Sequence, residues 1–118
     1  MSQVDRAGAE ERIARERAET AHLVAALTSE LEEIIESMSL SNNDDEHDPD
    51  GATNGYERAK ATAMLRHAQE RLGGLELAAA RLLEDTYGWC ERCGAEIGAE
   101  RLETLPTATR CVACATAG

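Results

Sequence analysis

Two apolar stripes of the same period set the strongest limit on how this chain can fold. Apolar side chains recur every three or four residues from Val24 to Met38, and again from Ala61 to Leu82. This spacing lines each set along one side of an α-helix. We therefore predict helices from about residue 4 to 40 and from about residue 54 to 85. The positions are Val24, Leu27, Leu31, Ile34 and Met38 in the first helix, and Ala61, Leu65, Ala68, Leu72, Leu75, Ala79 and Leu82 in the second.

The two helices are expected to pair. Each would be roughly 50 Å long with only a narrow apolar stripe, so neither would stay folded alone. Residues 41–53 between them include Pro49 and five acidic side chains but no basic one. Such a short connection makes the helices antiparallel, with Met38 near Ala61. We predict a mainly α fold, a long antiparallel coiled-coil hairpin over residues 1–86 with an acidic tip loop at 41–53.

Three details of this hairpin are open to test. Ile13 lies on roughly the same face as the first stripe, but polar residues around it predict a seam that weakens towards the N-terminus. Asn54, with Glu57 three residues later, is placed to cap the second helix. Gly73-Gly74 interrupts that helix at a cost of about 1 kcal/mol per glycine, and marks either close packing or a bend.

The charge balance limits the possible partners. The 118 residues carry 23 acidic and 12 basic side chains, a formal net charge of −11. Binding to DNA phosphates depends on clustered Lys and Arg, so direct DNA binding is not expected. With one Trp, two Tyr and no Phe, a large enzyme with a deep pocket is excluded, and no Ser, His and acid set indicates catalysis. We therefore predict that the protein is not an enzyme. No apolar run has the length of a signal peptide or a membrane span, which predicts a soluble, cytoplasmic protein.

Four cysteines form the most specific local pattern. Cys90-x-x-Cys93 is followed after 17 residues by Cys111-x-x-Cys114, a spacing typical of four-thiolate zinc sites. Four protein thiolates leave no open position for water or substrate, so one structural Zn²⁺ is expected in a small lobe at residues 87–118. Gly94 suits the turn after the first pair. The alternative, redox pairs or disulfides, lacks the βαβ pattern of thioredoxin-like proteins.

The residues around these cysteines resemble the zinc finger of the DksA/TraR family, and the preceding acidic-tipped hairpin is similar to that family as well. The matching segment reads Tyr87-Gly88-x-Cys90-Glu91-x-Cys93-Gly94-x-Glu96-Ile97-Gly98-x-x-Arg101-Leu102-Glu103-x-x-Pro106-Thr107-Ala108-x-x-Cys111-x-x-Cys114. The resemblance implies a bacterial transcription regulator that binds RNA polymerase, inserts its coiled coil through the secondary channel and modulates initiation. Some members act together with the alarmone guanosine tetraphosphate.

The resemblance also implies that acidic residues at the tip come close to the polymerase active site. Well-known members carry Asp-x-x-Asp-x-Ala there. In this chain Asp50-x-Ala52 matches the second half, but His47 stands three residues before Asp50, while Asp45-x-x-Asp48 keeps the carboxylate spacing. The candidate tip residues are therefore Asp45, Asp48, Asp50 and Ala52.

Two other functions compete with this one. The same features suit a zinc-stabilised coiled-coil adaptor, or a protein that dimerises along its apolar seam instead of remaining a monomer. A thiol redox protein or zinc sensor would need labile cysteines.

Three arginines lie near the cysteines in sequence. Arg92, Arg101 and Arg110 could offset the net −2 charge of a zinc tetrathiolate.

Overall fold

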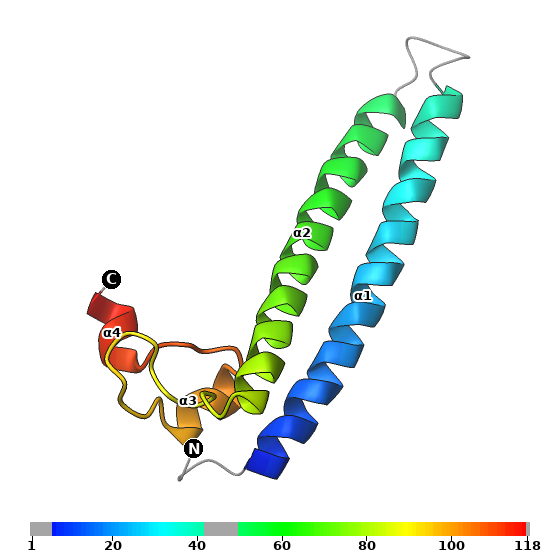
Figure 1. The fold of residues 1–118 in the computed structure, drawn as a ribbon. Helices are drawn as coiled ribbons and strands as arrows, with labels where there is room; N and C mark the ends of the chain where they lie inside the picture. The colour runs from blue at the N-terminus through cyan, green and yellow to red at the C-terminus, as the bar shows by residue number, and fades with distance from the viewer. Residues whose placement is uncertain (1–5, 42–49, 118) are drawn as a thin grey trace. The chain divides into compact units, whose positions relative to one another are not determined.

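The protein is mainly helical, as predicted. The computed structural model describes residues 6–41 and 50–117, with side chains at 6–40 and 55–117. The helices are α1 (Arg6–Ser41), α2 (Asp50–Leu83), α3 (Ala99–Thr104) and α4 (Val112–Ala117). The long helices α1 and α2 run antiparallel, and α3 and α4 belong to the C-terminal segment that carries the cysteines (Figure 1). No helix of the described ranges is long and apolar enough to cross a membrane.

The second long helix begins earlier than predicted. We expected α2 to start near Asn54, but it starts at Asp50, directly after Pro49. Proline fixes φ and lacks an N–H, so it interrupts a helix less at its start than within it. Asn54 therefore lies inside α2, and the prediction that it caps the helix is wrong.

Residues Thr20–Arg71 form one compact unit, made of the distal parts of α1 and α2. Leu27, Ala61 and Ala68 are buried along its seam, and the other predicted apolar positions are partly buried. Thr20 is also buried, at 6% exposure. The predicted spacing therefore identifies the seam of this unit, with small side chains at several positions that allow the helices to approach closely.

One surface groove of this unit shows which parts of the two helices lie side by side. It is lined by Ile34 of α1 and by Ala61 and Met64 of α2, so Ile34 lies near Ala61. The predicted neighbour of Ala61, Met38, lies one helical turn further along α1 and is partly buried.

The second compact unit joins residues 1–19 to residues 72–118. Its seam does not weaken as predicted, because Ala9 and Ile13 are 0% and 1% exposed. These side chains pack in one apolar cluster with residues of α2 and of the cysteine segment. Of the polar residues that suggested a weak seam, Glu11, Arg15 and Arg17 are exposed, whereas Thr20 is buried. The cluster consists of Ala9, Ile13, Ala78, Leu82, Tyr87, Cys90, Ile97, Leu102 and Ala108.

A Schellman motif ends α2 and turns the chain towards the cysteines. The Thr86 N–H donates to the Arg81 carbonyl at 2.9 Å and the Asp85 N–H to the Leu82 carbonyl at 3.3 Å. Asp85 occupies the left-handed position, with φ of 61°, where glycine is usual. Arg6 compensates by pairing with the Asp85 carboxylate and donating to the Leu82 carbonyl at 2.8 Å. The first turn of α1 thus caps the end of α2.

The two adjacent glycines of α2 have different surroundings. A Cβ added at Gly74 would meet Thr107 Cγ2 at 3.4 Å, while a Cβ at Gly73 would meet nothing within 4 Å. A Cβ at Gly74 would therefore make ordinary van der Waals contact with Thr107, so neither glycine is required to avoid a steric clash.

These surroundings predict that either glycine can be replaced by alanine with a gain in stability. Gly73→Ala should stabilise the protein by about 1 kcal/mol, because alanine costs less backbone entropy in a helix interior. Gly74→Ala should gain at least as much, since its methyl group would also make van der Waals contact with Thr107. Urea unfolding of the zinc-saturated proteins measures both, and a loss of stability in Gly74→Ala would contradict the prediction.

Candidate metal centre

The four cysteines meet in one cluster. Their sulfur atoms all lie within 4.8 Å of one another, and the Sγ atoms of Cys93 and Cys111 are 3.7 Å apart. A tetrahedral site with Zn–S bonds near 2.3 Å has sulfur–sulfur edges of about 3.8 Å. None of the four cysteines forms a disulfide. The arrangement fits one structural Zn²⁺, with all four metal positions supplied by thiolates.

The first cysteine pair lies on a tight turn. The Gly94 N–H donates to the Cys90 carbonyl at 2.9 Å, and the Cys90 N–H donates to the Ala95 carbonyl at 2.7 Å. Gly94 has φ of 77°, a left-handed conformation that side-chain-bearing residues rarely adopt. The turn places the Cys93 N–H 3.5 Å from Cys90 Sγ, where it stabilises a thiolate. The prediction that Gly94 serves this turn is confirmed.

The second pair is presented by α4. Cys111 precedes the helix and Cys114 lies in its first turn, and the Ala115 N–H donates to the Cys111 carbonyl at 2.9 Å. One helical turn brings side chains three residues apart to the same face. Both sulfurs of this pair therefore face the turn that holds Cys90 and Cys93.

A small core beneath the cluster holds the two pairs in place. Tyr87 is 1% exposed and donates its hydroxyl to the Pro106 carbonyl at 2.9 Å. Leu102 of α3 is fully buried, and Ile97, whose N–H donates to the Gly88 carbonyl at 2.8 Å, is 6% exposed. Tyr87 precedes the first cysteine pair and Pro106 precedes the second. Their hydrogen bond therefore links the two chain segments that lead to the metal site.

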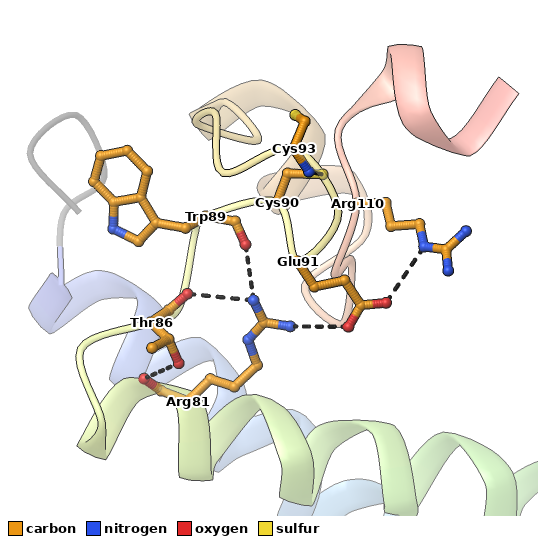
Figure 2. A network of polar contacts seen from close by, with 7 residues as sticks. All are labelled: Arg81, Thr86, Trp89, Cys90, Glu91, Cys93 and Arg110. Atoms are coloured by element: carbon orange, nitrogen blue, oxygen red, sulfur yellow. Dashed lines mark hydrogen bonds and ion pairs between the residues drawn. The ribbon is translucent and has the colours of Figure 1, made fainter. Parts of the chain in front are cut away.

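Charged residues surround the cluster, as Figure 2 shows. Arg81 of α2 donates to the Trp89 carbonyl at 2.8 Å and lies 3.8 Å from the Glu91 carboxylate. Arg110 pairs with the same carboxylate at 3.3 Å. The backbone N–H of Glu91 donates to the Thr109 carbonyl at 2.8 Å. Polar contacts therefore connect the first cysteine turn to the end of α2 and to the residues before Cys111.

The cysteines differ in acidity without metal. Backbone N–H groups, that of Cys93 foremost and those of Cys111 and Arg92 after it, lower the pKa of Cys90 to about 6. Hydrogen bonding to the Cys111 thiol, followed by burial, raises the pKa of Cys114 to about 12. At neutral pH the Cys90 thiol is therefore mostly ionised, while Cys114 keeps its proton until metal displaces it.

This proton makes zinc affinity dependent on pH. Zinc binds thiolates, so its binding at pH 7 to 8 must release at least the proton of Cys114, whose pKa lies far above that range. Each released proton raises the apparent affinity about tenfold per pH unit. Competition with a chelator of known pH dependence at pH 7.0, 7.5 and 8.0 measures the slope. An affinity that stays constant over this range would contradict the prediction.

Sequence reasoning found the cysteines but missed most of their supporting residues. Of the three arginines expected to offset the cluster charge, Arg110 pairs with Glu91 and Arg101 donates to the Arg110 carbonyl at 3.0 Å. Arg81 and the buried hydroxyl of Tyr87 were not predicted. Arg81 sits among helical residues of ordinary composition, and only the Schellman motif that follows it brings its side chain to the finger.

The four candidate tip residues lie at the start of α2 or precede it in sequence. Asp45 and Asp48 lie outside the described residues, and Asp50 and Ala52 lie in the first turn of α2 without described side chains. Their proximity to a polymerase active site stays a prediction.

Comparison with known proteins starts from the finger. Residues 85–117 match the family profile described as prokaryotic dksA/traR C4-type zinc finger. Over 102 residues, the chain is 33% identical to the protein named RNA polymerase-binding transcription factor DksA of Haemophilus influenzae, covering 80% of the chain and 70% of that protein. The chain belongs to the DksA/TraR family. The resemblance seen in the sequence is therefore confirmed over both the finger and the helices.

Other relatives match over shorter stretches. The chain is 48% identical over 65 residues to the uncharacterized protein YteA of Bacillus subtilis, but this stretch covers only 27% of that protein. It is 43% identical over 42 residues to the DksA of Escherichia coli K12, covering 28% of its length. The DksA relatives are named as transcription factors and not as enzymes, which agrees with the prediction that this chain is not an enzyme.

A solved structure shows the same fold. The transcription factor DksA2 from Pseudomonas aeruginosa matches with a TM-score of 0.79 at 24% identity, covering 95% of this chain and 81% of that one. The likeness supports the predicted architecture of two long antiparallel helices followed by a four-cysteine finger.

Proposed function

We propose that this protein is a bacterial transcription regulator that binds RNA polymerase directly. The observation that carries the proposal is the 33% identity over 102 residues to a protein named RNA polymerase-binding transcription factor DksA. That alignment includes far more than the 33 residues of the finger profile. The helices, which would make the contact, are therefore part of the similarity.

In the proposed mechanism the helical hairpin enters the polymerase secondary channel. Antiparallel pairing of α1 and α2 gives a narrow element of the kind that can enter a channel. The predicted tip segment, residues 41–53, carries five acidic residues and no basic one. Carboxylates are natural ligands of Mg²⁺ and are attracted to basic surfaces. Asp45, Asp48, Asp50 and Ala52 would act near the catalytic centre, and the zinc finger would stabilise the other end of the hairpin.

The remaining parts of the proposal concern partners and location. We propose a cytoplasmic monomer that does not bind DNA, because the segment from Cys90 to the end carries three Arg against four Glu. Guanosine tetraphosphate is a candidate co-regulator on the strength of the family resemblance alone.

One experiment tests binding and its consequence together. Core RNA polymerase is pulled down with the zinc-loaded protein, and initiation is then measured in vitro with and without guanosine tetraphosphate. We expect the protein to bind polymerase and to change the amount of initiated transcript. Failure to bind polymerase would overturn the proposal, and an effect independent of the alarmone would remove only that co-regulator.

A double substitution at the tip tests the mechanism. Asp48→Asn with Asp50→Asn removes two charges from the tip, so we expect polymerase binding within about threefold of the wild type but a loss of the effect on initiation. The control is Glu32→Gln with Glu33→Gln, which removes the same charge from exposed positions of α1. If both double variants regulate initiation equally, the tip does not act as proposed.

A second candidate, the dimerising adaptor, is favoured by one surface feature. In the unit Thr20–Arg71, Leu23 and Met64 are 48% and 47% exposed around a groove whose floor includes Leu27 and Ala68. Exposed apolar side chains of this kind can mark a protein contact. Light scattering over a range of concentrations decides between the two, because the proposed regulator stays monomeric and the adaptor that dimerises does not.

A further inference from the structure

Arg81 connects the end of α2 to the first cysteine turn. Its side chain is only 18% exposed. It donates to the carbonyl of Trp89, the residue before Cys90, at 2.8 Å, and to the Thr86 carbonyl at 3.4 Å. A hydrogen bond from a guanidinium is charge-assisted and about twice as strong as a neutral one. In Figure 2 the guanidinium lies between the Trp89 carbonyl and the Glu91 carboxylate.

Glu91 connects that turn to the second cysteine pair. It lies between Cys90 and Cys93 in sequence, and its carboxylate oxygens lie 3.8 Å from Arg81 and 3.3 Å from Arg110. Arg110 directly precedes Cys111. Its backbone carbonyl accepts a hydrogen bond from Arg101 at 3.0 Å, so both ends of the residue are held.

We propose that Arg81, Glu91 and Arg110 form an ion-pair chain that holds the two cysteine pairs together and slows the release of zinc. Zinc release is easier when one cysteine pair moves away from the other, because two ligands are then lost together. That movement separates Glu91 from Arg110 or the first turn from Arg81. The inference concerns the metal centre alone and is independent of polymerase binding.

The charges support the same role. A zinc tetrathiolate carries a net charge of −2, which attracts cations and repels carboxylates. Glu91 stands beside a cysteine at the cluster, so its charge alone would disfavour the zinc-bound state. Pairing with two guanidinium groups offsets that repulsion and adds positive charge on both sides of the site. The three residues therefore combine a mechanical link with a favourable charge arrangement.

The exposed fractions of these side chains determine how much each substitution should accelerate zinc release. Glu91 and Arg110 are 48% and 44% exposed, and such pairs contribute no more than about 1 kcal/mol, which is about fivefold in a rate. Arg81 is better shielded and makes a charge-assisted hydrogen bond, so its loss should have the larger effect, about tenfold.

The test is the rate at which the zinc-loaded full chain releases zinc to an excess of chelator, followed with a metal-sensitive dye. Arg81→Gln should release zinc about tenfold faster than the wild type, and Arg110→Gln about two- to fivefold faster. The matched control is Arg92→Gln. Arg92 lies in the same turn, is exposed and forms no side-chain ion pair within the described part of the chain, so its loss changes the charge but not the link.

Glu91→Gln provides a second variant for the case that Arg81→Gln does not fold. Its side chain is half exposed, so the variant should fold. The loss of both ion pairs should speed zinc release, and the loss of the carboxylate charge beside the cluster should offset part of that effect, so we expect release about two- to threefold faster. In this background Arg110→Gln should add almost nothing, because its partner is already gone. The proposal is overturned if Glu91→Gln or Arg81→Gln releases zinc no faster than Arg92→Gln, or if Arg110→Gln accelerates release equally with and without Glu91.

Discussion

Replacing Cys111 with serine is expected to abolish stoichiometric zinc binding and to unfold residues 87–117. The finger contributes few side chains to the apolar cluster, namely Tyr87, Ile97, Leu102 and Ala108 besides Cys90. So few buried groups do not offset the chain entropy of ordering about 30 residues. In zinc-finger peptides the metal supplies about 10–16 kcal/mol, most of which is folding free energy. Chelation of zinc from the wild type should have the same result.

Trp89 provides a direct readout, because it is the only tryptophan and lies next to Cys90. We expect its fluorescence to shift to that of an exposed indole in Cys111→Ser, and zinc content to fall from one to near zero per chain. Ala113→Ser is the matched control, since it places a hydroxyl at an exposed position between the same two cysteines without removing a ligand. A Cys111→Ser protein that retains zinc with wild-type affinity would show that the fourth thiolate is dispensable.

The sequence predicts the long-range plan of this protein because its signals are periodic. Apolar residues at three- and four-residue spacing depend only on helix geometry, and all positions of the second stripe are buried or partly buried in the structure. The cysteine spacing is equally informative, since two residues between ligands allow one tight turn. These signals also carry the family resemblance, which the comparisons confirm.

Details that depend on tertiary contacts could not be predicted in this way. We expected α2 to begin near Asn54, but it begins four residues earlier, at Asp50. Ile13 is buried although its neighbours in sequence are polar, because the cysteine segment adds apolar side chains to the same cluster. The Arg6 cap on α2 joins residues 79 positions apart. Propensity and periodicity contain no information about such contacts.

Replacing Tyr87 with alanine is expected to cause the largest loss of stability of any single substitution outside the cysteines. The side chain is 1% exposed and is among the largest buried groups, so its removal leaves a cavity in the cluster that joins α1, α2 and the finger. Loss of a buried aromatic side chain costs about 3–5 kcal/mol. Urea unfolding in excess zinc measures the change, with the metal kept saturated so that the core contribution is isolated.

Tyr87→Phe separates the hydrogen bond from the packing. It keeps the ring but leaves the buried Pro106 carbonyl without its 2.9 Å donor, at a cost of about 1–3 kcal/mol. Burial also raises the pKa of Tyr87, so the folded state holds its proton more tightly than the unfolded state. The stability that the Tyr87 hydroxyl contributes to the folded state is therefore complete below pH 10 and declines as the pH rises above that value. The Tyr87→Phe variant should lack this decline.

Tyr56 is the matched control, because it is 71% exposed and lies on α2 away from this cluster. Tyr56→Ala should change the free energy of unfolding by no more than about 0.5 kcal/mol. If Tyr87→Ala is destabilised no more than Tyr56→Ala, Tyr87 does not anchor the finger. If Tyr87→Phe matches the wild type while Tyr87→Ala is strongly destabilised, packing of the ring alone carries the effect, and the bond to Pro106 serves only to orient it.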